Sequence, residues 1–142
     1  MSSDPARPHL DELSFALTVS ADAFFVDTAR DVGARIGEVA GCDSDHAARL
    51  GRAIEWVLTT VAGSRSAATP REIDVAFLGT GRLLRVELSC QAGGEAGAFS
   101  LEEALTASGC AEALHDLVDR VEFRRETDRQ ICRLTRQIPQ VR

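Results

Sequence analysis

Residues 43–63, DSDHAARLGRAIEWVLTTVAG, carry the clearest helical pattern in the chain. Acidic and hydroxyl residues at the start are typical of a helix N-cap, and Gly63 follows the last apolar position. Between the two ends, apolar residues three or four positions apart form one stripe: Leu50, Ile54, Val57 and Val61. Such a stripe is buried against a second layer, so we expect this helix to lie on a sheet with Ile54, Val57 and Val61 inside.

Two elements are expected before this helix. Residues 13–19 alternate apolar and small side chains, which is the period of a half-buried strand. The segment Ser20-Ala21-Asp22 resembles a helix N-cap and opens a second stretch of helical spacing, which Gly41 is expected to end. The order so far is one strand and two consecutive helices.

Two alternating runs follow the turn-rich connector at residues 63–71. Their apolar positions are Ile73, Val75 and Phe77 in the first run and Leu84, Val86 and Leu88 in the second. Gly79-Thr80-Gly81 lies between the runs and fits a hairpin turn. The remaining sequence predicts a glycine-rich segment at 91–100, helical segments at 101–107 and 111–118, and closing strands at 121–125 and 131–138.

This order of elements predicts an α+β fold. Because hairpins join most of the strands, we expect a two-layer sandwich in which helices cover one face of an antiparallel-rich mixed sheet. We expect residues 13–138 to form this domain, with an N-terminal extension at residues 1–12 and a C-terminal tail at residues 139–142.

Length, composition and charge exclude several classes of protein. A chain of 142 residues with 44% apolar and 27% charged residues is typical of one globular domain. The net charge of −6 argues against broad nucleic-acid binding, whose affinity comes mainly from lysine and arginine. No apolar run is long enough to span a membrane, and the first residues lack the features of a basic, apolar leader. We therefore expect a cytoplasmic protein with no membrane and no nucleic-acid partner.

The cysteines and histidines match no zinc or redox spacing: Cys42, Cys90, Cys110, Cys132, His9, His46 and His115. We expect the four thiols to be reduced and to fill small positions of the core. We also expect no metal site.

The element order and several punctuation residues carry a family resemblance. They include a strand ending LTVSA at residues 17–21, the Gly41-Cys42 turn before an acid-rich helix start, and LHDLVDRVEF at residues 114–123. With these features the chain resembles the GHKL, or histidine-kinase-like ATPase, family and within it the anti-sigma-factor serine kinases. The resemblance covers roughly residues 13–138. It implies the histidine-kinase-like ATPase fold and a sigma factor or antagonist domain as protein partner, and it allows a homodimer.

The family's nucleotide chemistry depends first on the N box, a helix with a glutamate that activates a hydroxyl and, four residues later, an asparagine that holds Mg²⁺. Aligned on Ala53-Ile54, this chain has Trp56 at the glutamate position and Thr60 at the asparagine position. An indole has no basic oxygen, and a neutral hydroxyl is a weak replacement for an amide ligand. Glu55 does not compensate, because a helix turns about 100° per residue and Glu55 points to another face.

Two glycine turns complete the family's nucleotide site. The adenine-reading turn, Asp-x-Gly-x-Gly, matches residues 90–94, with Cys90 at the aspartate position and Ala92 and Gly94 at the glycine positions. A cysteine cannot replace a charged acceptor, so only Gly94 fits. The phosphate-cradling Gly-x-Gly has a single counterpart, Gly109, in shifted register.

The three altered motifs predict a protein without kinase activity, because phosphoryl transfer depends almost wholly on placing Mg²⁺ and phosphate. We expect no catalytic residue, no cofactor, and a regulatory protein of the anti-sigma-factor type that acts by protein–protein binding. One alternative is a serine/threonine kinase that binds Mg-ATP in an atypical pocket. Another is a small-molecule sensor that uses the vacated nucleotide pocket, lined by Trp56, Thr60 and Cys90. Trp56 is expected to fill the core or the pocket, or to stack on a ligand ring.

Basic charge concentrates near the C-terminus, where residues 119–142 hold seven arginines against four acids. Six of these arginines alternate with apolar residues in the closing strands: Arg120, Arg124, Arg125, Arg129, Arg133 and Arg136. Alternation is typical of a solvated sheet face, and a contact surface for an acidic protein is the other interpretation. Because apolar residues take the inward positions, we expect Arg124, Arg125 and Arg133 to face outward as candidate partner contacts.

Overall fold

The computed structural model describes residues 12–64, 69–91, 99–126 and 128–138. Within them the elements are β1 (Glu12–Ser20), α1 (Ala23–Ala40), α2 (Ser44–Gly63), β2 (Glu72–Thr80), β3 (Leu83–Gln91), α3 (Leu101–Ala107), α4 (Cys110–Leu114), β4 (Arg120–Glu126) and β5 (Arg129–Gln137). Every expected strand and helix is found close to its predicted place. The helix α4 is shorter than expected, because the chain turns after Leu114.

The strands form one sheet in the order β1-β2-β3-β5-β4, and every neighbouring pair is antiparallel. The α+β class is confirmed, whereas the expectation of a mixed sheet is wrong for the described strands. The helical hairpin of α1 and α2 explains the difference: the chain reverses three times, from β1 to α1, from α1 to α2 and from α2 to β2, so β2 lies beside β1 in the opposite direction. A tight turn then reverses β2 into β3, and β5 runs antiparallel to β4.

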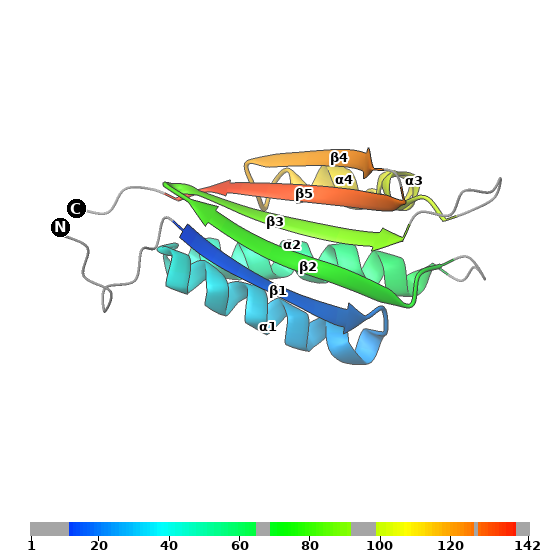
Figure 1. Ribbon diagram of the computed structural model, residues 1–142, viewed down its shortest axis with the longest axis horizontal. Coiled ribbons are helices and arrows are strands. Elements are labelled where there is room, and N and C mark those ends of the chain that lie inside the picture. Colours follow the sequence, from blue (N-terminus) through cyan, green and yellow to red (C-terminus); the bar gives the residue numbers. More distant parts are fainter. Residues whose placement is uncertain (1–11, 65–68, 92–98, 127, 139–142) are drawn as a thin grey trace.

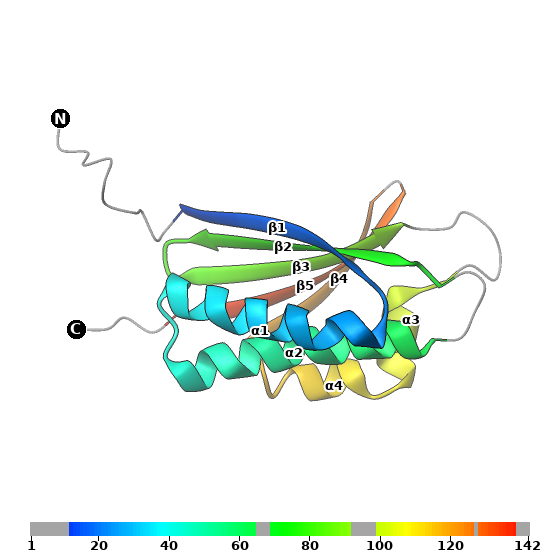
Figure 2. The ribbon, with the colours of Figure 1, turned by 90° about the horizontal axis from the view of Figure 1, so that it is seen from below.

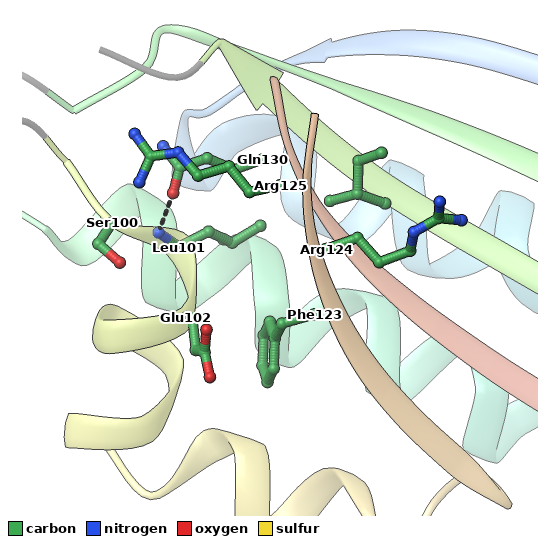
Figure 3. A pocket seen from close by; sticks show the side chains of 8 residues that line it. Ser100, Leu101, Glu102, Phe123, Arg124, Arg125 and Gln130 are labelled. Carbon is green, nitrogen blue, oxygen red and sulfur yellow. Dashed lines mark hydrogen bonds between the residues drawn. The ribbon is translucent and has the colours of Figure 1, made fainter. Parts of the chain in front are cut away.

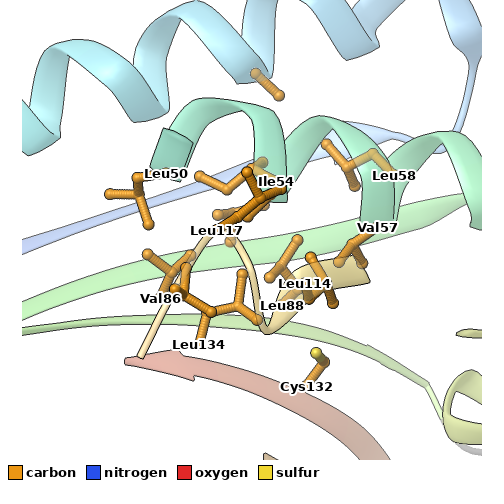
Figure 4. Packing of buried hydrophobic residues seen from close by; sticks show 14 of the residues in the cluster. Leu50, Ile54, Val57, Leu58, Val86, Leu88, Leu114, Leu117, Cys132 and Leu134 are labelled. Atoms are coloured by element: carbon orange, nitrogen blue, oxygen red, sulfur yellow. The ribbon is translucent and has the colours of Figure 1, made fainter. Parts of the chain in front are cut away.

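The described helices all lie on one face of the sheet (Figures 1 and 2). The core forms between α2 and the strands, where Leu50 and Ile54 face Val86 and Leu134 (Figure 4). Ile54, Val57 and Val61 are fully buried, as the apolar stripe predicted. The fold is therefore a two-layer α/β sandwich with one layer of helices and one of strands.

Sequence-predicted caps delimit both long helices. The Asp22 carboxylate accepts a hydrogen bond from the Phe24 amide at 2.9 Å, and Gly41 ends α1 with a left-handed φ of 113°. At α2, Asp43 Oδ1 accepts from the His46 amide at 2.8 Å, and Asp43 Oδ2 lies 2.9 Å from His46 Nδ1. These hydrogen bonds satisfy amides that a helix leaves unpaired at its first turn.

The Asp43 cap predicts a pH-dependent contribution to stability. Hydrogen bonds from the backbone and side chain of His46 lower the pKa of the Asp43 carboxyl. A lowered folded-state pKa means that the contribution is complete above the unfolded pKa and is lost as pH falls through the folded pKa. We expect Asp43→Ala to lower the melting temperature at pH 7 and to differ less from wild type near pH 3. Asp43→Ser, which can cap without titrating, should retain more of the stability; an equal deficit of Asp43→Ala at both pH values would contradict the assignment.

The two long helices approach closely because glycines line their contact. A Cβ added to Gly51 would lie 2.6 Å from the carbonyl oxygen of Arg30, and one added to Gly33 would lie 2.4 Å from Ile54 Cδ1. Arg30 also bridges the pair, with its guanidinium 3.3 Å from the Glu55 carboxylate. The absence of side chains at these glycines lets α1 and α2 form a tight helical layer.

Candidate functional site

The N-box positions lie on the second half of α2, on the side turned away from the core. Trp56 is 37% exposed, so the expectation that it fills the core is wrong. The Thr60 hydroxyl donates a hydrogen bond to the Trp56 carbonyl at 2.8 Å and is thereby engaged by its own helix. The pair therefore presents an exposed indole and a hydroxyl that is hydrogen-bonded within its own helix, and neither group is a carboxylate or an amide.

The adenine position, Cys90, ends the inward-facing row of β3 and is 1% exposed. Burial raises the pKa of its thiol to about 11, and the nearby charge of Arg129 lowers it only in part. The thiol is therefore neutral at physiological pH and faces apolar core side chains. Ala92 and Gly94, the other predicted positions of this turn, lie outside the described residues.

Gly109 is brought close to the N-box helix. It precedes α4 with a left-handed φ of 79°, and the side chain of the next residue, Cys110, lies near the Thr60 hydroxyl. Burial raises the pKa of Cys110, and the nearby Thr60 hydroxyl offsets this only in part. The packing of α4 beside α2 therefore places Thr60 near the segment around Gly109.

All four cysteines are free and buried. Burial raises the pKa of Cys132 to about 12 and also raises the pKa of Cys42. Thiols in this state are poor nucleophiles and poor metal ligands, because both roles need the thiolate. The interpretation of the cysteines as core residues is confirmed by their burial.

A polar side chain that the sequence analysis did not single out organises the end of the sheet beside α3. Gln130 is 6% exposed, and its Oε1 accepts a hydrogen bond from the Leu101 amide at 2.6 Å. Its Nε2 donates to the Phe99 carbonyl at 2.8 Å. Gln130 therefore holds the segment that enters α3 against β5. The sequence signal for this role was a polar residue at an inward-facing position of β5, opposite Cys90 and two residues before Cys132.

A pocket of about 220 Å³ lies beside this contact (Figure 3). It is lined by Ser100, Leu101, Glu102, Phe123, Arg124, Arg125, Gln130 and Ile131. Its volume is below the roughly 300–1,000 Å³ of ordinary small-molecule sites. Of the expected nucleotide-pocket positions that the structure describes, Trp56, Thr60, Cys90 and Gly109, none lines it.

The three candidate partner-binding arginines do not share one face. Arg124 lies opposite Ile131 on the side of the sheet away from the helices, whereas Arg125 lies opposite Gln130 on the helix side. Figure 3 shows their side chains on opposite sides of β4. The expectation that Arg125 faces outward with Arg124 is wrong, because consecutive strand residues point to opposite faces.

The side of the sheet that no described helix covers, hereafter the uncovered face, is held together by polar contacts. Asp74 accepts hydrogen bonds from Thr18 and from Arg129, each at 2.6 Å, and Arg129 also reaches Ser89 at 3.0 Å. Its other members include Ala16, Ala76, Leu78, Arg85, Glu87, Glu122, Arg124, Ile131 and Arg133. This network joins side chains from four adjacent strands: β1, β2, β3 and β5.

Arg133 lies on the uncovered face but is not an open charge. Its Nε donates to Glu87 at 2.8 Å, and about one fifth of each side chain is exposed. Arg136 departs further from the expected solvated row: it lies on the core side opposite Leu84, is buried, and has its Nη1 atom 3.9 Å from Asp119 Oδ1. Arg124, paired with Glu126 at 3.7 Å, is the most exposed of the outward-facing candidates.

Among the described residues no group of three histidine, cysteine, aspartate or glutamate side chains is placed to hold a metal ion. None of the described helices combines the length and apolar character that crossing a membrane requires. No protein-family model and no curated protein sequence gives a significant match to this chain.

Proposed function

We propose that this protein is a regulatory binding module of the anti-sigma-factor type, which acts by protein–protein contact and does not transfer phosphate. The observation that carries the proposal is the chemistry of the side chains at three expected nucleotide-site positions: Trp56, Thr60 and Cys90. The Thr60 hydroxyl donates its hydrogen bond to the Trp56 carbonyl, and Cys90 presents a buried neutral thiol. Phosphoryl transfer needs a fixed Mg²⁺ ligand and a base in those places.

The arrangement of elements supports the same family resemblance. Two long helices between β1 and β2, and two short ones between β3 and β4, give the order that the histidine-kinase-like ATPase layout implies. The approach of the Gly109 segment to Thr60 agrees with it. A retained scaffold with altered site residues is consistent with selection on surfaces and not on chemistry.

The surface open to a partner is the uncovered face, with Arg124 at its β4 border. Its ion pairs fix side chains before any partner arrives, which lowers the entropy lost on binding. A sigma factor or an antagonist domain is the partner that the resemblance implies. Arg124 is placed to speed encounter with an acidic partner, because charges at a rim act mainly on association rate.

The nucleotide test of this proposal is calorimetric titration with Mg-ATP. We expect no binding in the low micromolar range, because neither Thr60 nor Trp56 can complete a Mg²⁺ site. The double variant Trp56→Glu, Thr60→Asn restores the family's pair at two surface-accessible positions and is the informative comparison. Low-micromolar binding by the wild-type chain, or transfer of labelled phosphate to a serine of a copurifying protein, would overturn the proposal and favour the kinase alternative.

A further inference from the structure

The arginines of the sheet differ in whether an acid neutralises them. Four of them have a nitrogen between 2.6 and 3.9 Å from a carboxylate oxygen: Arg124, Arg129, Arg133 and Arg136. Arg85 on β3 and Arg120 on β4 have neither an ion pair nor a side-chain hydrogen bond with any residue that the structure describes. Their guanidinium groups keep all their donors for an external anion.

Strand register places these two arginines in one row across the uncovered face. Arg85 lies opposite Thr135 of β5, and Thr135 lies opposite Arg120 of β4. Their chain neighbours Leu84 and Leu134 face the core, so all three point away from the helices. Figure 1 looks onto this face, with β3, β5 and β4 side by side in front of the helices. Strands are about 4.8 Å apart, so the two arginines start about 10 Å apart with a hydroxyl midway.

Positive charge exceeds negative charge around this row. The next row along the same three strands holds Glu87, Arg133 and Glu122. Glu87 accepts a hydrogen bond from Arg133 at 2.8 Å, and Glu122 lies opposite Arg133 on its other side. With Arg85 and Arg120 this part of the face has three cations against two acids, and the surplus lies in the row of the two unpaired arginines.

Two exposed leucines border the row at Arg85. Leu78 lies opposite Arg85 on β2, and Leu83 precedes it by two residues on β3, so both share its face. They are 36% and 41% exposed, although they are large and apolar. A ligand that contacts Arg85 can therefore also cover apolar surface, which a free inorganic anion cannot do.

We propose that Arg85, Thr135 and Arg120 bind the phosphate group of a phosphate monoester, whose apolar organic part rests on Leu78 and Leu83. Two guanidinium forks match phosphate oxygens and balance a charge near −2, and the hydroxyl supplies a further donor between them. The site lies on the opposite face of the sheet from the expected nucleotide positions. It is therefore independent of the proposed function.

Nuclear magnetic resonance titration with phenyl phosphate as the probe tests the site. At pH 7.5 and low salt, the Nε–Hε signals of Arg85 and Arg120 and the Thr135 amide signal should shift together. Two charge-assisted contacts on an open face fit a dissociation constant on the order of 1 mM. Inorganic phosphate, which lacks the apolar part, should bind about tenfold more weakly. Equal affinity for the two probes would overturn the monoester assignment.

The charge of the probe gives a second readout. The second pKa of a phosphate monoester is about 6, so affinity for phenyl phosphate should fall as pH is lowered from 7.5 to 5. Benzenesulfonate has the same ring and only one negative charge, so it should bind weakly at both pH values. Binding of benzenesulfonate as tight as that of phenyl phosphate at pH 7.5 would contradict a site built for a dianion.

Variants separate this site from general attraction of anions. Arg85→Gln and Arg120→Gln should each raise the dissociation constant for phenyl phosphate by about tenfold, and Thr135→Val by several-fold without a change of charge. Arg52→Gln is the matched control, because Arg52 is an exposed arginine of α2 that also has no acidic partner among the described residues. It should leave the affinity unchanged, and circular dichroism checks that each variant is folded. An equal loss in Arg52→Gln and Arg85→Gln would show an adventitious ion only and overturn the proposal.

Discussion

Replacing Gly51 with alanine should lower the free energy of unfolding by about 2 kcal/mol, even though alanine is the better helix former. The new Cβ would lie 2.6 Å from the Arg30 carbonyl oxygen, which belongs to the backbone of α1 and cannot rotate away. The helices must separate, and the contact between Arg30 and Glu55 must lengthen with them. Chemical denaturation followed by circular dichroism gives the number, and Gly51→Val should be worse.

Two comparisons separate this clash from a general effect of removing glycine. Gly63→Ala adds a Cβ with nothing within 4 Å, so it should leave stability unchanged or raise it by up to about 1 kcal/mol. Gly33→Ala meets only the end of the Ile54 side chain, so Ile54→Val, which removes that Cδ1 atom, should rescue it. A favourable coupling of about 1 kcal/mol in this double-mutant cycle is expected. A Gly51→Ala protein as stable as wild type would show that the helices can move apart at no cost.

The long helices could be predicted from the sequence because their signals are local. Asp43 and Gly63 bound a stripe of apolar residues, and each of these features acts within a few residues of itself. The close helix contact could not be predicted in the same way. Gly33 and Gly51 are ordinary helix-weakening residues in sequence, and their role exists only once the hairpin brings α1 against α2.

The predicted arginine surface failed in part for a related reason. Alternation along one strand assigns residues to two faces, but Arg124 and Arg125 are consecutive and cannot share one. The pairing of Arg133 with Glu87 and of Arg129 with Asp74 joins residues more than 40 positions apart. Such partners depend on strand order and register, which the hydrophobic pattern of a single strand does not specify.

The region of the candidate site could be predicted from the sequence, but the contacts of its side chains could not. Thr60 and Gly109 were expected in one region, and the packing of α4 beside α2 brings them there. The actual use of the Thr60 hydroxyl, which bonds its own helix, is a rotamer choice that the sequence pattern leaves open. Gln130 is the clearest case, because its two partners lie 29 and 31 residues away.

Replacing Gln130 with methionine should lower the free energy of unfolding by about 3 kcal/mol. Methionine has a similar size but can neither accept from the Leu101 amide nor donate to the Phe99 carbonyl. Each buried polar group left without a partner costs about 1–3 kcal/mol. Hydrogen exchange should speed up selectively at the amides of α3, because Gln130 satisfies the first of them. Gln137→Met, at an exposed position of the same strand, is the matched control and should change neither measurement.

Gln130→Glu distinguishes the two hydrogen bonds from simple packing. A neutral glutamic acid offers one donor and one acceptor, as the amide does, whereas the ionised form offers no donor to the Phe99 carbonyl and buries a charge. Burial and the facing carbonyl should raise the folded-state pKa of this introduced carboxyl. Its neutral form is then the stable one, so the variant should approach wild-type stability at acid pH and lose it as pH rises through that pKa. A Gln130→Glu protein as stable as wild type at both acid and neutral pH would mean that Gln130 stabilises the α3 segment by shape alone.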